Sequence, residues 1–209
     1  MTRADVAVIM ARGRSRRMGR AKGLVQWVPD GPPLVRIIAD TYRAAGIPFL
    51  VVTLPDLAAA YGAAVGEGGG GAILPAEPGG DTARTMVLAR RFLAGEGVTH
   101  LWAHPVAMPL VQESTLVLLR KVSRLRPTEV VRPALNLQPG HPVILPETRV
   151  KGFEALDGWR EGSVRDLLAG DGFQKTRMVW VDDHGVVSDF DRPEDLPPGS
   201  PTSPGRGVT

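Results

Sequence analysis

A basic loop that contains glycines is the first feature of the sequence with residue types suited to chemistry. Six of the 25 lysines and arginines lie between Arg12 and Lys22, with Gly13 and Gly19 among them. Glycines let the backbone turn so that several N–H groups face one anion, and cationic side chains neutralise its charge. The loop follows an apolar run at residues 6–10, and open parallel sheets bind ligands outside the carboxyl ends of their strands. We therefore predict a phosphate-binding loop.

The spacing of this loop excludes two common phosphate-binding motifs. No Gly-Lys-Ser/Thr follows, which excludes a Walker loop, and Gly13 and Gly19 do not give the GxGxxG spacing of dinucleotide-binding folds. The alternative interpretation is a solvated basic turn, because clusters of basic side chains commonly face water. Its position after the first predicted strand favours phosphate binding over that alternative.

Composition limits the classes of protein to which the chain can belong. Among its 209 residues, 43% are hydrophobic and 22% are charged, as in globular domains, and there is no cysteine to form disulfides or thiolate metal sites. No apolar run approaches the roughly 18–20 residues of a membrane helix. The net charge of +3 does not favour nucleic-acid binding, and no aromatic residue lies in the basic loop to stack on bases. The first ten residues do not resemble a signal peptide, so we expect a cytoplasmic protein.

Apolar runs alternate with helical periodicity along most of the chain, and this alternation predicts βαβ units. We predict strands at residues 6–10, 49–54, 72–75 and 99–104, and helices at 33–45, 56–64, 81–93 and 109–125. Two extended runs at 129–134 and 141–145 then suggest a hairpin-like insertion. A short helix at 163–169 and strands at 178–181 and 186–190 follow. The predicted fold is α/β, with a mostly parallel sheet between helices.

The tail differs from the rest in composition. Proline, glycine and serine dominate residues 197–209, which we expect to be disordered, and residues 1–196 are expected to form one domain. Trp102 and Trp180 fall in predicted strands and are expected in the core, whereas Trp27 and Trp159 lie in predicted loops.

The loop sequence from Val8 to Lys22 resembles the signature of nucleotidyltransferases that act in molybdenum-cofactor maturation. Six positions match that signature in register: Gly13, Ser15, Arg17, Met18, Gly19 and Lys22. The segments 104–111, 140–145 and 189–196 resemble the same family in the same order, and the last two are more similar to its cytidylyltransferase than to its guanylyltransferase branch. The resemblance spans about residues 5–196. It implies a Rossmann-like, three-layer fold of the nucleotide-diphospho-sugar transferase type.

The same resemblance implies a reaction and a set of site residues. A nucleoside triphosphate, CTP or GTP, would lie across the loop, and a phosphate of a pterin acceptor such as molybdopterin would displace pyrophosphate from the α-phosphorus. Arg17 and Lys22 would balance the charge of the leaving pyrophosphate. The remaining implied roles are nucleotide binding by Ala11, Arg12, Gly13, Ser15, Met18 and Gly19, acceptor binding by Gly140, His141 and Pro142, and Mg²⁺ binding by Asp189 and Asp191.

Two positions depart from the family pattern at the expected site. Ala107 replaces the metal-binding aspartate, and a methyl group cannot ligate Mg²⁺, so we expect a weakened metal site. Arg12 replaces a small residue, and its side chain either blocks the base pocket or points outward to add a phosphate contact. Asp191 has a second interpretation as the N-cap of a last helical turn. His100, His104 and His184 form no recognisable metal-ligand set with His141, and we interpret these three as structural.

Two functional hypotheses remain open at this stage. The first is a nucleotidyltransferase that joins CMP or GMP to a phosphorylated acceptor. The second, suggested by Ala107, is a catalytically impaired homologue that binds a nucleotide or a finished cofactor and delivers it to a partner such as a molybdoenzyme or its chaperone.

Overall fold

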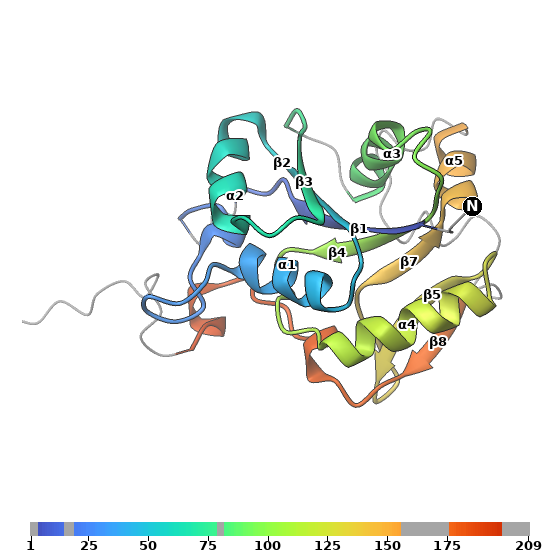
Figure 1. Cartoon of the computed structure of the whole chain (residues 1–209). Helices are drawn as coiled ribbons and strands as arrows, with labels where there is room; N and C mark the ends of the chain where they lie inside the picture. The colour runs from blue at the N-terminus through green and yellow to red at the C-terminus, as the bar shows by residue number, and fades with distance from the viewer. Residues whose placement is uncertain (1–3, 15–18, 79–81, 156–175, 198–209) are drawn as a thin grey trace, which may run out of the picture.

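Eight strands and five α-helices make up the computed structural model, which describes residues 4–14, 19–78, 82–155 and 176–197 (Figure 1). The strands are β1 Ala4–Ala11, β2 Phe49–Thr53, β3 Gly71–Pro75, β4 Val98–Pro105, β5 Val130–Leu135, β6 Gln138–Pro139, β7 Val143–Pro146 and β8 Thr176–Trp180. The helices are α1 Leu34–Ala44, α2 Ala58–Val65, α3 Thr82–Phe92, α4 Glu113–Leu125 and α5 Glu147–Ala155. Short 3₁₀ turns lie at Lys22–Leu24, Pro55–Leu57, His184–Val186 and Pro193–Asp195.

The strands form one mixed sheet in the order β3-β2-β1-β4-β7-β5-β6, with β8 paired to β5. Strands β1 to β4 pair with one another in parallel, and β5 is parallel to β8, whereas β7 runs antiparallel to both β4 and β5. The chain builds outward from β1 to β3 and then returns to the other side of β1 with β4. Such a reversal of strand order opens a crevice at the carboxyl ends of the two central strands, where doubly wound folds bind ligands.

Alternate residues of the strands pack into two separate core layers. Ile9 and Trp102 belong to the layer under α1, α2 and α4, while Val8 and Ala103 belong to the layer under α3 and α5. Figure 1 shows the two groups of helices on opposite faces of the sheet. Strands buried on both faces read as continuous apolar runs, as the sequence of β2 does. The predicted three-layer α/β fold with a mostly parallel sheet is therefore confirmed.

The predicted hairpin-like insertion is wrong in its placement. The runs at 129–134 and 141–145 correspond to β5 and β7, which pair with each other and form part of the central sheet. The tight turn joins β5 to β6 instead, through Asn136 and Leu137, both of which have positive φ. Two consecutive residues in this left-handed region are typical of the turns that match the twist of a β-hairpin.

Two further element predictions are wrong, one in where a helix begins and one in the type of element. Helix α4 begins at Glu113 and not at Pro109, and the carboxylate of distant Asp183 accepts hydrogen bonds from the Gln112 N–H at 2.9 Å and the Thr115 hydroxyl at 2.7 Å. This carboxylate satisfies donors at the helix start, as a cap does. The run at 186–190 is not a strand, because its backbone bonds to loops on either side and not to a neighbouring strand.

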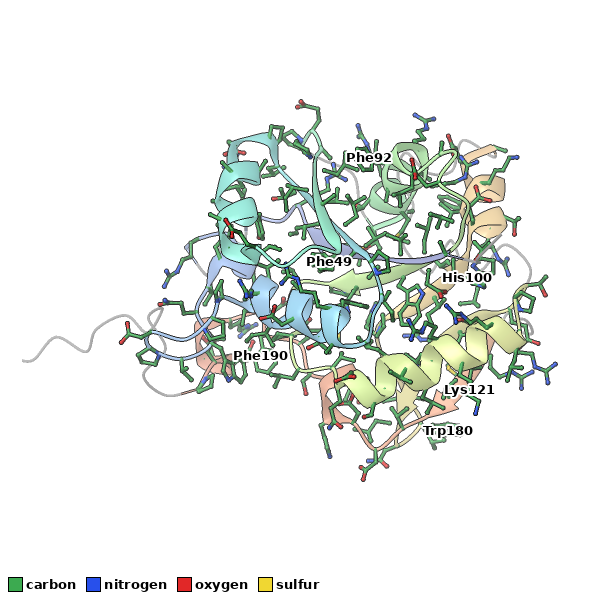
Figure 2. All side chains as sticks on the ribbon, viewed as in Figure 1. Phe49, Phe92, His100, Lys121, Trp180 and Phe190 are labelled. Carbon is green, nitrogen blue, oxygen red and sulfur yellow. The ribbon has the colours of Figure 1, made fainter. Side chains whose placement is uncertain are left out.

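Trp180 is 59% exposed, contrary to its predicted place in the core, whereas Trp102 is fully buried as predicted. Trp180 ends β8, which has β5 on one side only, so its side chain stands at an edge of the sheet (labelled in Figure 2). Trp159, the predicted helix at 163–169 and residues 198–209 of the predicted tail lie outside the described residues. None of the described helices combines the length and apolar character required to span a membrane.

Candidate active site

A cleft of about 270 Å³ opens at the crevice between the carboxyl ends of β1 and β4. Its described lining consists of Met10, Gly13, Lys22, Pro105, Val106, Ala107, Asp189 and Asp191. These residues come from the end of β1 and the loop after it, the end of β4 and the loop after it, and the closing segment of the chain. The structure therefore brings together the predicted basic loop, the position of the missing aspartate and both predicted metal ligands.

Lys22 extends into the cleft and contacts the carboxylate of Asp191. The lysine side chain is 15% exposed and the aspartate side chain 46% exposed, so the ion pair is at the rim of the cleft. Asp189 lies beside this pair, and its pKa is raised by burial and by the negative charge of Asp191, while Lys22 opposes that rise. One ammonium and two carboxylates thus face the same small space.

The position of Lys22 depends on the glycine that follows it. A Cβ atom on Gly23 would lie 2.6 Å from Cε1 of Tyr61 and 2.7 Å from Cγ2 of Val106, so a side chain cannot fit at residue 23. Tyr61 is buried on α2, and burial raises its pKa to about 12. Its hydroxyl faces the Gly23 backbone but has no partner in hydrogen-bonding geometry among the described residues. Gly23 and Tyr61 were not among the predicted site residues, because neither belongs to a motif visible in the sequence.

The closing segment lies along the loop after β4. The N–H of Phe190, which is labelled in Figure 2, donates to the Ala107 carbonyl at 2.9 Å. The Phe190 ring packs edge-on against Trp27 with centroids 4.7 Å apart. The carboxylate of Asp195 accepts the N–H groups of Asp191 and Arg192 at 2.8 and 2.7 Å. The Asp195 carboxylate therefore binds the N–H groups at the start of the last turn. The Asp191 carboxylate contacts Lys22 instead.

The donor set at the cleft suits a metal that arrives with its substrate. Asp189 and Asp191 supply two carboxylates, and no group of three or more potential ligands occurs among the described residues. Mg²⁺ in phosphoryl-transfer sites is commonly held by one or two carboxylates together with substrate phosphates and water. The methyl group of Ala107 adds no ligand to this set.

Arg12 bonds to protein groups on the α3 side of the loop. Its Nη1 donates to the Thr85 hydroxyl at 3.1 Å, and its Nη2 donates to the Glu77 carbonyl. The side chain thus ties the loop after β1 to the segment after β3 and does not line the described cleft. Ala11 is buried at the end of β1, and Gly19 has a positive φ of 68°. Three predicted loop residues lie outside the described residues: Ser15, Arg17 and Met18.

The predicted acceptor residues come directly before β7. Because β7 runs antiparallel to β4, its start lies beside the carboxyl end of β4, where the cleft opens. The His141 N–H donates to the Val186 carbonyl at 2.8 Å, and a Cβ on Gly140 would collide with that carbonyl, so residue 140 must be glycine. The His141 Nδ1 lies 3.4 Å from the Ala103 carbonyl, and burial lowers the pKa of the ring to about 4. A cis peptide bond joins His141 to Pro142. The three predicted acceptor residues lie near the cleft but are not part of its described lining.

His104 supports the loop after β4, as its structural interpretation implies. Its Nε2 donates to the Met108 carbonyl at 2.9 Å, and its Nδ1 accepts from the Tyr42 hydroxyl at 2.8 Å, an arrangement that requires the neutral ring. Burial lowers the pKa of His104 to about 4. The ring is therefore neutral near pH 7 and fixes the backbone next to Ala107.

Residues 7–177 match the family model of the MobA-like NTP transferase domain. No curated protein matches the chain significantly. The matched range covers most of the chain, including β4, most of β1 and the loops that follow them, and ends before Asp189 and Asp191 of the cleft.

Solved structures share the fold at low sequence identity. Rv0371c from Mycobacterium tuberculosis H37Rv is 24% identical, with a TM-score of 0.72 over 93% of this chain and 96% of that protein. Its complex with manganese aligns at 18% identity and a TM-score of 0.62, covering 92% and 95% of the two chains. A 4-diphosphocytidyl-2C-methyl-D-erythritol synthase from Anaerococcus prevotii is 15% identical, with a TM-score of 0.71 and 92% of each chain covered. Molybdopterin-guanine dinucleotide biosynthesis protein A from Archaeoglobus fulgidus is 18% identical, with a TM-score of 0.66 over 92% of this chain and 94% of that one.

Proposed function

The chain belongs to the family of MobA-like NTP transferase domains, and from this premise we propose that it transfers CMP or GMP from a nucleoside triphosphate to a phosphorylated pterin acceptor such as molybdopterin. Family membership identifies the chain as nucleotidyltransferase-like, with a nucleoside triphosphate as substrate. The choice of nucleotide and the identity of the acceptor form the proposal.

The contact between Lys22 and Asp191 is the observation that carries this proposal. It joins the basic loop after β1 to the acidic closing segment, 169 residues apart in the sequence, at the edge of the cleft. A nucleotidyl transfer needs positive charge for the triphosphate and carboxylates for its divalent ion, both near one phosphorus atom. Lys22, Asp189 and Asp191 provide those groups.

The proposed chemistry is an in-line displacement at the α-phosphorus. An oxygen of the acceptor phosphate forms a new P–O bond, the bond between the α-phosphorus and the bridging oxygen breaks, and pyrophosphate leaves. Lys22 would balance the charge that gathers on the pyrophosphate, and backbone N–H groups near Gly13 would hold the phosphates. When bound to Asp189 and Asp191, Mg²⁺ would supply further charge neutralisation. Binding by Ser15, Met18 and Gly19, and catalysis by Arg17, remain part of the proposal.

The acceptor is proposed to approach from the β7 side of the cleft. Gly140, His141 and Pro142 lie there, adjacent to β4, while the basic loop occupies the β1 side. The fold likeness to the Archaeoglobus fulgidus biosynthesis protein supports a pterin among the possible acceptors. A cytoplasmic location agrees with this proposal.

Ala107 supports a second candidate function, in which the chain binds a nucleotide or a finished cofactor and delivers it to a partner enzyme. The Ala107 methyl faces the same cleft as Asp189 and Asp191, so a carboxylate at this position would join the two that are present. In this second function the cleft would retain its affinity for the nucleotide or cofactor, but the chain would catalyse nucleotidyl transfer slowly. A molybdoenzyme or its chaperone would be the recipient.

One experiment separates the two candidates. Pyrophosphate release is measured with CTP, GTP and ATP, each with molybdopterin and Mg²⁺, for the unmodified chain, Ala107→Asp and the uncharged control Ala107→Asn. We expect turnover with CTP or GTP, increased by about tenfold in Ala107→Asp and not in Ala107→Asn. Nucleotide binding by calorimetry without turnover in the unmodified chain favours the delivery function. The absence of both binding and turnover contradicts both candidates.

A further inference from the structure

Arg132 is a cation in an otherwise apolar strand, and the sequence analysis did not identify it. It lies half-buried in the middle of β5, whose sequence is VVRPAL. Its Nε and Nη2 both donate to the carbonyl of Gly140, at 3.3 and 3.0 Å. Since β5 and β4 both run antiparallel to β7, they run in the same direction, so the end of β5 lies at the same edge of the sheet as the cleft.

The charge of Arg132 has no carboxylate partner in the part of the chain that the structure describes. Neighbouring arginines differ in this respect, since Arg177 on β8 pairs with Glu129, and Arg124 on α4 pairs with Asp5. Burial lowers the pKa of Arg132, which reflects the cost of removing its charge from water. A partly buried cation without a counter-ion is uncommon in proteins unless an anionic ligand supplies one.

The geometry of the guanidinium leaves one edge for such a ligand. The Nε–Nη2 edge is occupied by the Gly140 carbonyl, while Nη1 donates to none of the described residues. A guanidinium can offer a second pair of parallel N–H groups, from Nη1 and Nη2, which matches two oxygens of a phosphate. The bond to Gly140 holds the plane of the guanidinium and places this edge beside the Gly140–Pro142 segment.

The surroundings of Arg132 favour an anion over a cation. His141 lies close enough that the charge of Arg132 helps to lower its pKa, so the imidazole beside the guanidinium is neutral near pH 7. Next to this neutral imidazole, the positive charge of Arg132 favours a bound anion.

We propose that Arg132 binds the phosphate of the acceptor through the Nη1 and Nη2 edge of its guanidinium, on the β7 side of the cleft and independently of Lys22. The acceptor phosphate would then enter from the β5 and β7 side, opposite the basic loop that holds the triphosphate. The inference rests on the proposed function for its biological acceptor, although the anion site itself is a property of Arg132 and its surroundings.

Phenyl phosphate is the probe that tests the site, with binding followed by calorimetry in the absence of nucleotide. Arg132→Met is expected to weaken binding by about tenfold or more, and Arg132→Lys by less, since lysine keeps the charge and loses the two-pronged geometry. Arg177→Met is the matched control, because Arg177 lies on the neighbouring strand β8 in the register of Val131 and pairs with Glu129. The titrations are repeated in a Lys22→Met background, where the loss caused by Arg132→Met should persist.

Several results would overturn the site. These are no detectable phenyl phosphate binding to the unmodified chain, equal binding by Arg132→Met, or an equal loss in Arg177→Met. Amide hydrogen exchange at Gly140 and His141 checks that the loop keeps its structure in Arg132→Lys. If the loop is unchanged and Arg132→Lys binds phenyl phosphate as tightly as the unmodified chain does, the proposed contact of two guanidinium nitrogens with the phosphate is wrong.

The outcome for Arg132 can be distinguished from the outcome for the proposed function. With molybdopterin as acceptor, Arg132→Met should raise the KM for the acceptor and leave the KM for the nucleoside triphosphate unchanged. Turnover with an unchanged acceptor KM overturns the role of Arg132 alone. If Arg132→Met loses phenyl phosphate binding but the unmodified chain shows no nucleotidyl transfer, the anion site is supported and the proposed reaction is contradicted.

Discussion

The two ends of the central sheet each hold an aspartate against a basic group, and they do so in opposite environments. At the amino end, the Asp5 side chain is 3% exposed, accepts a hydrogen bond from Arg124 Nη2 at 3.2 Å and lies 3.7 Å from Nδ1 of His100, which is labelled in Figure 2. At the carboxyl end, Asp191 is half-exposed at the rim of a cleft and contacts Lys22.

The difference concerns which contacts a ligand can replace. Asp5 is enclosed by Trp102, His100 and the core, so its interactions stabilise the folded chain and no ligand reaches them. Lys22 and Asp191 keep access to the cleft, so an incoming triphosphate and its metal can take over both charges. Solvent-exposed ion pairs contribute little to folding, whereas breaking a buried one is costly. We therefore expect the charges at the carboxyl end to serve ligand binding and those at the amino end to serve stability.

Replacing Lys22 should produce the largest functional change. We expect Lys22→Met to lower kcat/KM for the nucleoside triphosphate by about 10²–10³-fold, because a positioned cation at the developing pyrophosphate charge is lost. Its unfolding free energy should change by less than about 1 kcal/mol, since the pair with Asp191 is partly exposed. Pyrophosphate release and urea unfolding measure the two effects. Arg14→Met, which removes an exposed cation of the same loop paired with Asp56, is the control. Equal activity of Lys22→Met and Arg14→Met would remove Lys22 from the mechanism.

Replacing Asp5 should give the opposite result. Asp5→Ala leaves the Trp102 N–H and the His100 ring without their acid, and we expect a loss of about 3 kcal/mol in unfolding free energy. Urea unfolding measures this loss, and Asp56→Ala, which breaks the exposed pair with Arg14, should cost less than about 1 kcal/mol. The affinity for nucleotide should be the same in Asp5→Ala as in the unmodified chain under conditions where both are folded. A weakened nucleotide affinity would show that the two ends of the sheet are coupled.

Acidification should affect the carboxyl end through His104. Burial lowers its pKa to about 4 in the folded chain, against 6.5 for an unperturbed histidine, so the unfolded chain binds the proton more readily. The stability that depends on the neutral ring is complete above about pH 6.5 and is lost as the pH falls toward about 4, by up to about 1.4 kcal/mol per pH unit. Urea unfolding across this range measures the slope, and His104→Gln should reduce it. An unchanged slope in His104→Gln would assign the pH dependence to other groups.

The strands and helices of the fold could largely be predicted because local patterns determine them. The continuous apolar runs of the buried strands β1 and β2 are visible in the sequence, and β4 keeps a shorter run, Leu-Trp-Ala, between two buried histidines. The conformation of residues 186–190 could not be predicted, because their backbone bonds to loops and turns and not to a strand, while Val186 packs into the core. The Val186 carbonyl accepts from His141, and the Phe190 N–H donates to Ala107, so the run at 186–190 satisfies its backbone without a strand.

The candidate site was predictable only where its residues form a continuous motif. The basic loop and the acidic segment were identified by the resemblance to a family, and the contact of Lys22 with Asp191 agrees with that resemblance. Arg132 and Tyr61 were missed, because each contacts a glycine outside its own strand or helix, Gly140 and Gly23 respectively, and no sequence motif links the two positions. An arginine inside the apolar run of β5 was the one available signal for Arg132.

The smallest expected change concerns the hydroxyl of Tyr61, which belongs to the carboxyl end without reaching the cleft. A buried hydroxyl without a hydrogen-bond partner lowers stability, so Tyr61→Phe should leave the unfolding free energy unchanged or raise it by up to about 1 kcal/mol. The aromatic ring that fixes Gly23, and through it Lys22, is kept in this variant, so kcat/KM for the nucleoside triphosphate should remain within about twofold. Tyr61→Leu removes the ring as well, and here Lys22 should lose its fixed position and kcat/KM should fall. Thermal unfolding and pyrophosphate release for both variants distinguish the ring from the hydroxyl. A loss of activity in Tyr61→Phe equal to that in Tyr61→Leu would show that the hydroxyl itself serves the site. Tyr61 would then belong to the ligand-binding groups and not to the stabilising ones.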